Sequence, residues 1–242
     1  MAFKITTTRE AAKEQGLKVL VHGPPGAGKT VLCSTTGALD KTLIISAEAG
    51  LLSLRDYDIK VAKIETIDDL RDAYRSLRDD EHPFEWVCLD SVSEIAEVVL
   101  TRQKDANKDA RAAYGNLYDI MLDLLKNFRD LPLNVYMSCK QKREIEKIDE
   151  ERERTKLVPS LPGRKLTNNI SYLFDEVFAL RVEKDADGLY RVLQTQPDGR
   201  YEAKDRSGAL DLMEPPSLEA IHKKIMGPTA VGPAKAGSGE VA

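Results

Sequence analysis

The feature that most constrains this chain is a glycine-rich octapeptide, Gly23-Pro24-Pro25-Gly26-Ala27-Gly28-Lys29-Thr30. The apolar stretch at residues 17–22 before it predicts a strand, and the residues from Val31 onward predict a helix. The pattern G-x-x-x-x-G-K-[ST] between a strand and a helix is typical of a phosphate-binding loop, in which backbone N–H groups surround phosphates. Residues 23–31 are therefore predicted to bind the phosphates of ATP.

Two side chains of this loop have predicted roles of their own. Lys29 is expected to reach the β- and γ-phosphates, and the hydroxyl of Thr30 is expected to hold Mg²⁺. The alternative is a chance turn rich in glycine and proline. Because the whole octapeptide matches and both flanks fit, we favour the phosphate loop, with ATP and Mg²⁺ as ligands.

The composition is that of a soluble globular chain. Of the 242 residues, 42% are hydrophobic and 31% are charged, and no apolar run approaches the ~18 residues of a membrane span. We predict one domain over residues 1–226 and a disordered tail, rich in Gly, Ala and Pro, over residues 227–242. The formal net charge of −4 gives no global footprint of nucleic-acid binding, so any DNA contact must come from a local basic surface.

The three cysteines, Cys33, Cys88 and Cys139, form no CxxC pair and are odd in number. This pattern indicates reduced thiols rather than disulfides or a metal site. Residues 1–6 lack the apolar core of a signal peptide. We therefore expect a cytoplasmic protein that does not attach to a membrane.

Apolar stretches and amphipathic patterns alternate after a polar lead-in at residues 1–16. Further strands are predicted at residues 41–46, 84–89 and 133–138. Two apolar sets at helical spacing predict helices, the first after a capping box at residues 66–69: Ile67, Leu70, Tyr74 and Leu77, and then Leu117, Ile120, Met121, Leu124, Leu125 and Phe128. Strands that alternate with helices favour an α/β fold with a mostly parallel central sheet flanked by helices.

The pattern changes after Cys139. Residues 140–165 are dense in charge and show no core periodicity. Residues 175–182 and 188–196 predict two strands joined by a turn, which would give the fold a C-terminal antiparallel extension. A last short helix is predicted around Leu218, Ile221, His222 and Ile225.

A carboxylate that holds the water shell of Mg²⁺ is expected at the end of a neighbouring buried strand. Asp90 fits, because it ends the apolar stretch at residues 86–89; the alternative is that it caps a helix beginning near Ser91. In AAA+ ATPases a glutamate typically follows this aspartate and polarises the attacking water, whereas Ser91 follows it here. Glu48, at the end of the second strand, is therefore the candidate catalytic residue, and the alternative is a surface acid.

With these residues, the chain resembles the RecA-like ATPases. The strand end Ile44-Ile45-Ser46-Ala47-Glu48 is similar to the context of their catalytic glutamate, and Leu89-Asp90-Ser91 is similar to the end of their Walker B strand. The chain looks like the compact phage RecA-core ATPases linked to single-strand annealing and recombination. The resemblance to RecA-like ATPases covers most of residues 17–210. Leu161-Pro162-Gly163-Arg164 and Lys204-Asp205-Arg206-Ser207-Gly208 also look like the phage group. The resemblance implies a RecA-like P-loop NTPase fold and, for a phage protein, a location in the host cytoplasm.

The segment Lys204-Asp205-Arg206-Ser207-Gly208 resembles the Lys-x-Arg-x-Gly element of hexameric DnaB-type helicases and RadA proteins. In those proteins, two cations reach across a subunit boundary to the γ-phosphate of the neighbour. The resemblance implies catalytic roles in trans for Lys204 and Arg206 within a homo-oligomer, which is a ring or a filament. The alternative is a basic turn between two strands.

In RecA, a glutamine at the end of the fourth strand senses the γ-phosphate and relays this to a DNA-binding loop. The comparable residues here, Ser138 and Cys139, are not amides. Residues 140–165 follow that strand and contain nine basic and six acidic residues, with basic residues at both ends. We expect the ends to contact DNA phosphates while the middle projects as a hairpin; the alternative is a solvated mixed-charge face.

A second basic strip is predicted after Asp90, formed by Arg102, Lys104, Lys108 and Arg111. Tyr114 is the aromatic residue near it, so base stacking has little support from the sequence. The leading hypothesis is an ATP-hydrolysing DNA recombination protein that binds single-stranded DNA as an oligomer. A nucleotide or small-metabolite kinase is one alternative. An ATP-gated loader that acts through a single-strand-binding protein is another.

Overall fold

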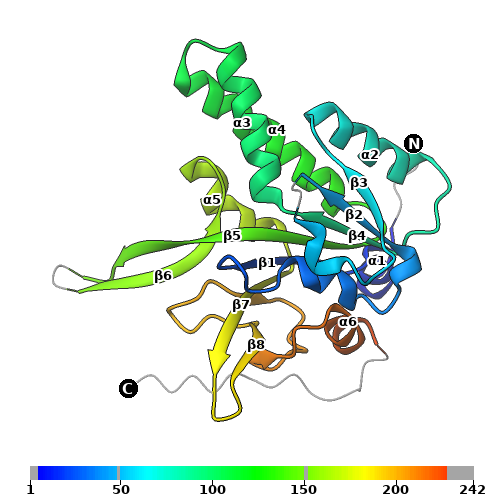
Figure 1. Ribbon diagram of the computed structural model, residues 1–242, viewed down its shortest axis with the longest axis vertical. Helices are drawn as coiled ribbons and strands as arrows, with labels where there is room; N and C mark the ends of the chain where they lie inside the picture. The colour runs from blue at the N-terminus through cyan, green and yellow to red at the C-terminus, as the bar shows by residue number, and fades with distance from the viewer. Residues whose placement is uncertain (1–4, 48–49, 150–151, 228–242) are drawn as a thin grey trace.

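The computed structural model describes residues 5–47, 50–149 and 152–227, and these residues form helices around one central sheet (Figure 1). The strand order is β10-β8-β7-β1-β5-β4-β2-β3, with β6 paired to β5 and β9 paired to β7. The strands are β1 (Lys18–Gly23), β2 (Thr42–Ser46), β3 (Lys60–Lys63), β4 (Trp86–Asp90), β5 (Asn134–Lys147), β6 (Glu153–Ser160), β7 (Glu176–Lys184), β8 (Leu189–Gln194), β9 (Lys204–Asp205) and β10 (Met213–Glu214).

The sheet is parallel from β3 to β7 and antiparallel elsewhere. β1 lies between β5 and β7 and is parallel to both, and β4 lies parallel between β5 and β2. β8 is antiparallel to β7, β10 to β8, β9 to β7 and β6 to β5. The expected α/β fold, with a mostly parallel central sheet, flanking helices and a C-terminal antiparallel extension, is confirmed.

α2 and α6 begin where their patterns predict, whereas α4 begins at Ala110, before Leu117, the first residue of its predicted stripe. The capping box forms, with the N–H of Asp69 donating to the Thr66 hydroxyl at 3.2 Å and the N–H of Thr66 donating to the Asp69 carboxylate at 2.7 Å. The helices are α1 (Thr8–Gln15), α2 (Ile67–Asp79), α3 (Val92–Ala106), α4 (Ala110–Arg129), α5 (Arg164–Ile170) and α6 (Leu218–Met226), and the 3₁₀ segments are η1 (Thr30–Thr35), η2 (Leu39–Lys41), η3 (Leu51–Leu54) and η4 (Ser171–Leu173).

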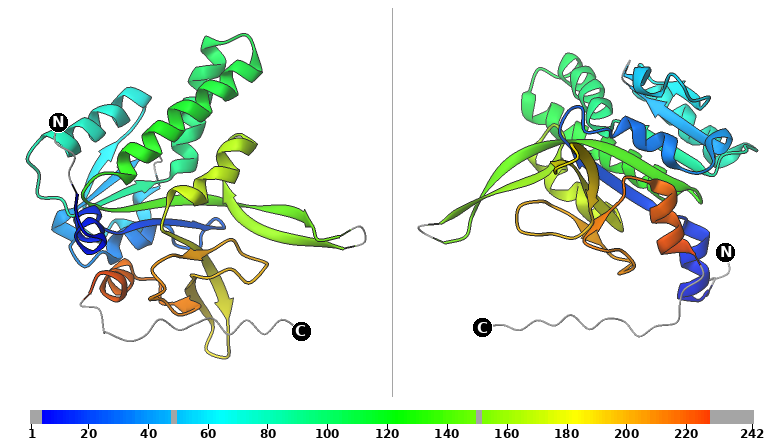
Figure 2. Two further views of the ribbon diagram at one scale, coloured as in Figure 1. Left: turned by 180° about the vertical axis from the view of Figure 1, so that it is seen from behind. Right: turned by 60° about the horizontal axis from the view of Figure 1, so that its bottom comes forward.

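Helices cover both faces of the sheet because its central strands are apolar on both sides (Figure 2). Every residue of β1 and β4 is buried, as is typical of parallel strands covered on both faces. Successive side chains alternate between the faces. Leu20 therefore belongs to a core shared with α2, α3, α4 and α5, whereas Val19 and Val21 belong to a second core shared with η1 and α6.

The elements that differ from the sequence prediction include α1 and β3. Residues 1–16 were expected to be a polar lead-in, but α1 forms there, because Thr7 and Glu10 make a capping box at its start. β3 was also not predicted. It is an edge strand beside β2 with mostly exposed residues, so it lacks the apolar run that marks the central strands.

The helix predicted after the phosphate loop is a short 3₁₀ segment, η1, rather than an α-helix. The hydroxyls of Ser34 and Thr35 donate to carbonyls three residues back, those of Val31 and Leu32, each at 2.8 Å. Such side-chain bonds compete with the α-helical pattern. Gly37, with a φ of 76°, follows the segment and turns the chain away.

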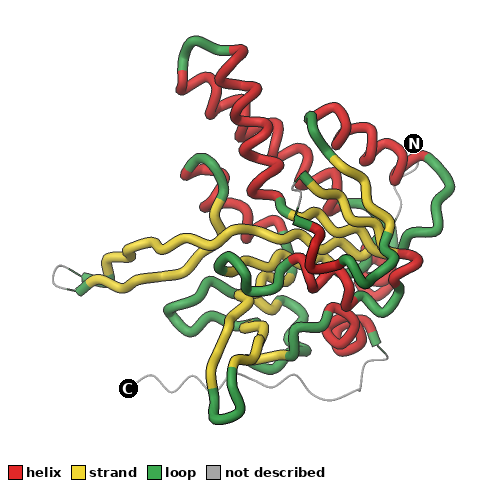
Figure 3. Tube along the Cα trace, viewed as in Figure 1, coloured by secondary structure: helices red, strands yellow, loops and turns green. Residues whose placement is uncertain are grey.

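The charge-dense segment after Cys139 forms a hairpin, as predicted. β5 continues past the sheet to Lys147 and pairs antiparallel with β6, from Lys140 opposite Ser160 to Lys147 opposite Glu153. Figure 3 shows these two strands extending together beyond the other strands. We refer to residues 140–149 and 152–160 as the β5–β6 hairpin.

Three further expectations concern the tail, the cysteines and membranes. The predicted disordered tail falls almost entirely on residues 228–242, which lie outside the described residues. Cys33, Cys88 and Cys139 are free and buried, and burial raises the pKa of the Cys139 thiol to about 11. Among the helices of the described residues, none is long and apolar enough to cross a membrane.

Candidate functional site

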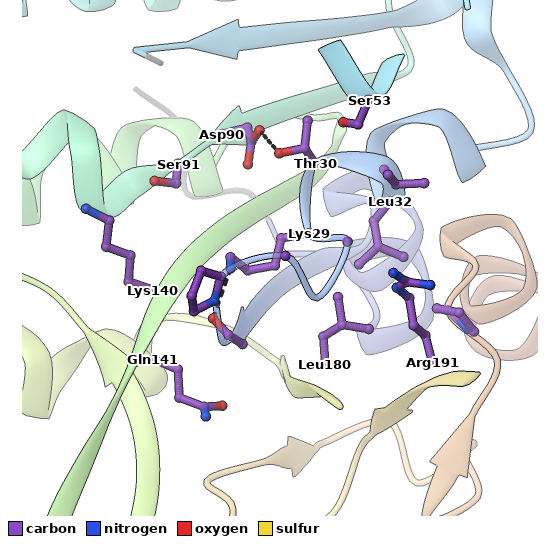
Figure 4. Close-up of a pocket in the computed structure, with 16 residues that line it drawn as sticks. Lys29, Thr30, Leu32, Ser53, Asp90, Ser91, Lys140, Gln141, Leu180 and Arg191 are labelled. Atoms are coloured by element: carbon purple, nitrogen blue, oxygen red, sulfur yellow. Dashed lines mark hydrogen bonds between the residues drawn. The ribbon is translucent and has the colours of Figure 1, made fainter. Parts of the chain in front are cut away.

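The phosphate loop follows the carboxyl end of β1 and lines a cavity of about 810 Å³ (Figure 4). Pockets for small ligands usually measure ~300–1,000 Å³, so a nucleotide can be accommodated. Gly26 and Gly28 have φ angles of 73° and 103°, which glycine adopts without strain, so the shape of the loop depends on them. Most of the residues predicted to bind phosphates line the cavity: Gly23, Pro25, Gly26, Gly28, Lys29, Thr30 and Val31.

The remaining two predicted residues, Pro24 and Ala27, close the loop through a bond from the Ala27 N–H to the Pro24 carbonyl at 3.3 Å. Lys29 folds back over the loop, and its Nζ donates to the carbonyls of Gly23 and Pro24 at 2.9 and 3.0 Å. The ammonium group is thereby held at the loop, where it can supply positive charge to a phosphate.

Thr30 and Asp90 come together across the cavity. The Thr30 hydroxyl donates to Oδ2 of Asp90 at 2.7 Å (Figure 4). The Ser138 hydroxyl donates to Oδ1 of the same carboxylate. Asp90 is buried at the carboxyl end of β4, beside β2. A hydroxyl and a carboxylate are hard oxygen donors, and Mg²⁺ usually takes only one or two protein ligands and keeps several waters. The donor set therefore fits the predicted Mg²⁺ site.

The helix after Asp90 is capped by a different residue from the one considered in the sequence. Ser91 is the N-cap of α3, and its hydroxyl accepts from the N–H of Glu94 at 3.3 Å. The peptide bond between Asp90 and Ser91 is cis. The Asp90 carboxylate is thus available to Thr30 and Ser138, and the alternative that it serves as a helix cap does not hold.

The cavity contains an amide that the sequence analysis missed. Cys139 is buried against Ser93 and the Ser160 carbonyl, whereas Gln141, two residues further along β5, lines the cavity. Residues two apart on a strand point to the same face. The structure therefore supplies a glutamine beside the phosphate loop at the base of the β5–β6 hairpin. The strand was predicted to end at Ser138, whereas β5 continues to Lys147, so Gln141 was not recognised as a strand residue beside the loop.

Gln141 is bonded to a buried histidine that directly precedes the loop. Nδ1 of His22 lies 3.1 Å from the Gln141 amide, and Nε2 lies 2.7 Å from the carbonyl oxygen of Glu202. Burial lowers the pKa of His22, which favours the neutral ring. A carbonyl oxygen only accepts, so Nε2 carries the proton and donates to it, and the Gln141 amide then presents its NH2 group to the lone pair of Nδ1. His22 thus joins three elements: β1, the base of the hairpin and the segment that leads to Lys204.

Glu48 lies outside the described residues, so the structure does not test it. β2 ends at Ser46, which pairs with Asp90. The chain therefore leaves β2 at the same edge of the sheet as the candidate Mg²⁺ ligand, which is the edge where a water-activating acid would be needed.

Lys204 and Arg206 lie at the other end of the sheet from the phosphate loop. Arg206 donates to Asp175 at 2.6 Å, and Nζ of Lys204 donates to the Ser171 carbonyl at 2.7 Å. Asp175 precedes β7, whose register places Glu176 beside Val19 at the start of β1. The loop follows the end of β1, so the structure does not bring these two cations to the loop of the same chain.

A cation that the sequence analysis missed does reach the loop. Nε of Arg191, on β8, donates to the carbonyl oxygen of Ala27 at 2.8 Å, and its side chain lines the cavity together with Leu180 and Pro216. No local motif marks this arginine, because the contact depends on the pairing of β7 with both β1 and β8.

Comparison with known proteins identifies the family. A family model described as an AAA domain matches residues 15–207. A search of curated proteins found no match. Among solved structures, the chain is similar to a KaiC-like protein from the hyperthermophilic archaeon Pyrococcus horikoshii, at 16% identity and a TM-score of 0.48, over 78% of this chain and 83% of that one. Because the family model spans most of the chain, from before the phosphate loop to beyond Arg206, the chain belongs to the AAA domain family of P-loop ATPases.

Proposed function

We propose that this protein hydrolyses ATP to control its assembly on single-stranded DNA, and that it promotes annealing or strand exchange in recombination. One observation carries the proposal. The phosphate loop, which carries Lys29 and whose Thr30 donates to Asp90, lines the same cavity as Lys140 and Gln141. These two residues are the first of the β5–β6 hairpin beyond the buried part of β5. Binding or hydrolysis of ATP thus takes place next to the β5–β6 hairpin, which is expected to contact DNA.

The hydrolytic roles follow from the geometry of the loop. Backbone N–H groups of Gly26 and of residues 28–31 hold the phosphates, and Lys29 places a positive charge beside them. Thr30 and Asp90 would hold Mg²⁺, and the ion would supply positive charge to neutralise the charge that develops on the transferred phosphoryl group. Glu48 orients the attacking water.

A pocket between α4 and α5 supports DNA binding beyond what the sequence indicated. Tyr114 and Tyr118, one helical turn apart on α4, line this pocket of about 590 Å³ together with Arg164 and Lys165. Nζ of Lys165 lies 3.9 Å from the ring centroid of Tyr118. Aromatic rings beside cations are what single-stranded nucleic acid requires, for base stacking and phosphate neutralisation. These contacts support the proposal that α4 and α5 provide a stacking surface for DNA bases, which the linear order of residues did not indicate.

A role in trans for Lys204 and Arg206 is consistent with their distance from the loop of their own chain. In a ring or filament, the end of one subunit's sheet that carries Arg206 would face the nucleotide cavity of the next subunit. The ion pair of Arg206 with Asp175 would then be exchanged for a phosphate. We therefore also propose that the protein forms a homo-oligomer in the cytoplasm and that it belongs to the phage RecA-core group.

The proposal is tested by ATP hydrolysis with and without single-stranded DNA, measured alongside the mass of the assembly. We expect DNA to raise the rate and to increase the mass when ATP is present. A rate that DNA leaves unchanged, together with transfer of phosphate to a nucleotide or metabolite, would instead establish the kinase alternative. Stimulation that appears only after a single-strand-binding protein is added would establish the loader.

A further inference from the structure

A bond between the C-terminal extension and the phosphate loop carries a further inference. Arg191 and Ala27 are 164 positions apart, yet Nε of Arg191 donates to the Ala27 carbonyl oxygen at 2.8 Å. Figure 4 shows Arg191 on the opposite side of the loop from Asp90. The arginine therefore contacts the loop from the side away from the candidate Mg²⁺ ligand.

The position of Arg191 is set by strand pairing. Arg191 lies opposite Val182 on β7, and β7 is parallel to β1, which leads directly into the loop. Gly28 leaves the space for the side chain, because a Cβ at Gly28 would lie 3.2 Å from Nε of Arg191. The sheet and the loop thus hold the donor and its acceptor in a fixed relation.

Among the described residues, no carboxylate competes with Ala27 for the guanidinium of Arg191. Across residues 5–47, 50–149 and 152–227, no ion pair involves Arg191, whereas Arg181 on the adjoining strand pairs with Glu183. An arginine whose partner is a surface carboxylate, as for Arg181, can be explained as an ordinary surface ion pair. Arg191 instead directs its Nε–H at a backbone carbonyl of the phosphate loop.

The consequence concerns the peptide between Ala27 and Gly28, which is trans. In a trans peptide, the C=O and the N–H point in opposite directions. Since the Ala27 carbonyl points at Arg191, the N–H of Gly28 points away from it. A bond from a cation to the carbonyl also polarises the peptide and makes its N–H a stronger donor.

We propose that Arg191 is a positioning residue, which holds the Ala27–Gly28 peptide so that the Gly28 N–H faces the α- and β-phosphates of a bound nucleotide. This inference rests on the proposed nucleotide binding. Because ATP and ADP share these phosphates, loss of Arg191 weakens both to the same extent. Turnover at saturating ATP changes little, since the residues facing the γ-phosphate are untouched.

The test measures the affinity of the full chain for fluorescent ATP and ADP analogues, with turnover and melting temperature recorded in parallel. Arg191→Met keeps the apolar stem and removes the donor, and it is expected to weaken both nucleotides by about tenfold. Arg191→Lys keeps a charged donor and is expected to recover most of the affinity. Lys184→Met, which removes an exposed cation from the same pair of strands, is the matched control and is expected to bind as the wild type does.

Several results would overturn the proposal. Wild-type affinity in Arg191→Met, a loss confined to the ATP analogue, or a lysine variant as weak as the methionine variant each contradicts it. A loss accompanied by a large fall in melting temperature in Arg191→Met, with Lys184→Met unaffected, assigns the arginine to stability alone. If the wild type binds neither nucleotide, the proposed function fails instead, and the two failures are thereby distinguished.

Discussion

Replacement of Glu176 by glutamine is expected to stabilise the protein at pH 8 and to have little effect at pH 5. Glu176 is 1% exposed, and its Oε1 accepts from the N–H of Ser207 at 3.1 Å. Its Oε2 has no hydrogen-bond partner within the described residues. Burial, together with the nearby charge of Asp205, raises the pKa of Glu176 from 4.5 to about 7.

The direction follows from proton binding. Between about pH 4.5 and 7 the unfolded chain has released this proton while the folded chain retains it, so the free energy of unfolding falls as the pH rises through that window. The shift in pKa corresponds to about 3 kcal/mol when each unit is worth ~1.4 kcal/mol. Glutamine keeps the acceptor for Ser207 and does not titrate. Its advantage is therefore expected to grow by about 2 kcal/mol between pH 5 and pH 8.

Urea-induced unfolding of the wild type and of Glu176→Gln at both pH values measures this difference directly. Glu97→Gln, at an exposed position on α3, serves as the control and should show no growth of the difference with pH. An advantage of Glu176→Gln that is equal at the two pH values, or larger at pH 5, would refute the reasoning.

Three further changes probe the assembly, the DNA surface and the core. Arg206→Ala is expected to leave ATP affinity unchanged and to lower turnover only at protein concentrations where the oligomer forms; equal turnover at every concentration refutes a role in trans. Tyr118→Ala, in the pocket between α4 and α5, is expected to weaken single-stranded DNA binding about tenfold at fixed salt, since stacking contributes ~1–3 kcal/mol per base. Tyr57→Ala, at an exposed tyrosine outside that pocket, is the control. Phe128→Ala is expected to lower the free energy of unfolding by about 3–5 kcal/mol in a denaturant titration, because the ring is fully buried; a loss below about 1 kcal/mol contradicts that packing.

The parts of the fold that were predictable are those with strong local signals. The loop at Gly23 to Thr30 has glycines where positive φ angles occur, and β1 and β4 are apolar runs buried on both faces. The helix at Leu117 to Phe128 was visible as an apolar stripe, and five of its six predicted core residues are buried: Leu117, Met121, Leu124, Leu125 and Phe128. In each case the pattern within a short stretch determines the structure.

The features that were missed depend on contacts between distant segments. Gln141 reaches the cavity only because β5 runs on into the hairpin, and Arg191 reaches Ala27 only through the pairing of three strands. Tyr118 gains Lys165 as a neighbour when α5 packs against α4. β3 was missed because it is an exposed edge strand whose residues carry no apolar run.

ATP hydrolysis by the wild type and by Lys29→Ala, titrated with single-stranded DNA, tests the central claim most directly. Nζ of Lys29 lies at the loop, so the variant is expected to lose turnover at every DNA concentration. The wild type is expected to hydrolyse ATP faster as DNA is added. Hydrolysis by Lys29→Ala at the wild-type rate would contradict the assignment of the loop, and wild-type turnover that is indifferent to DNA would contradict the link between the nucleotide cavity and the hairpin.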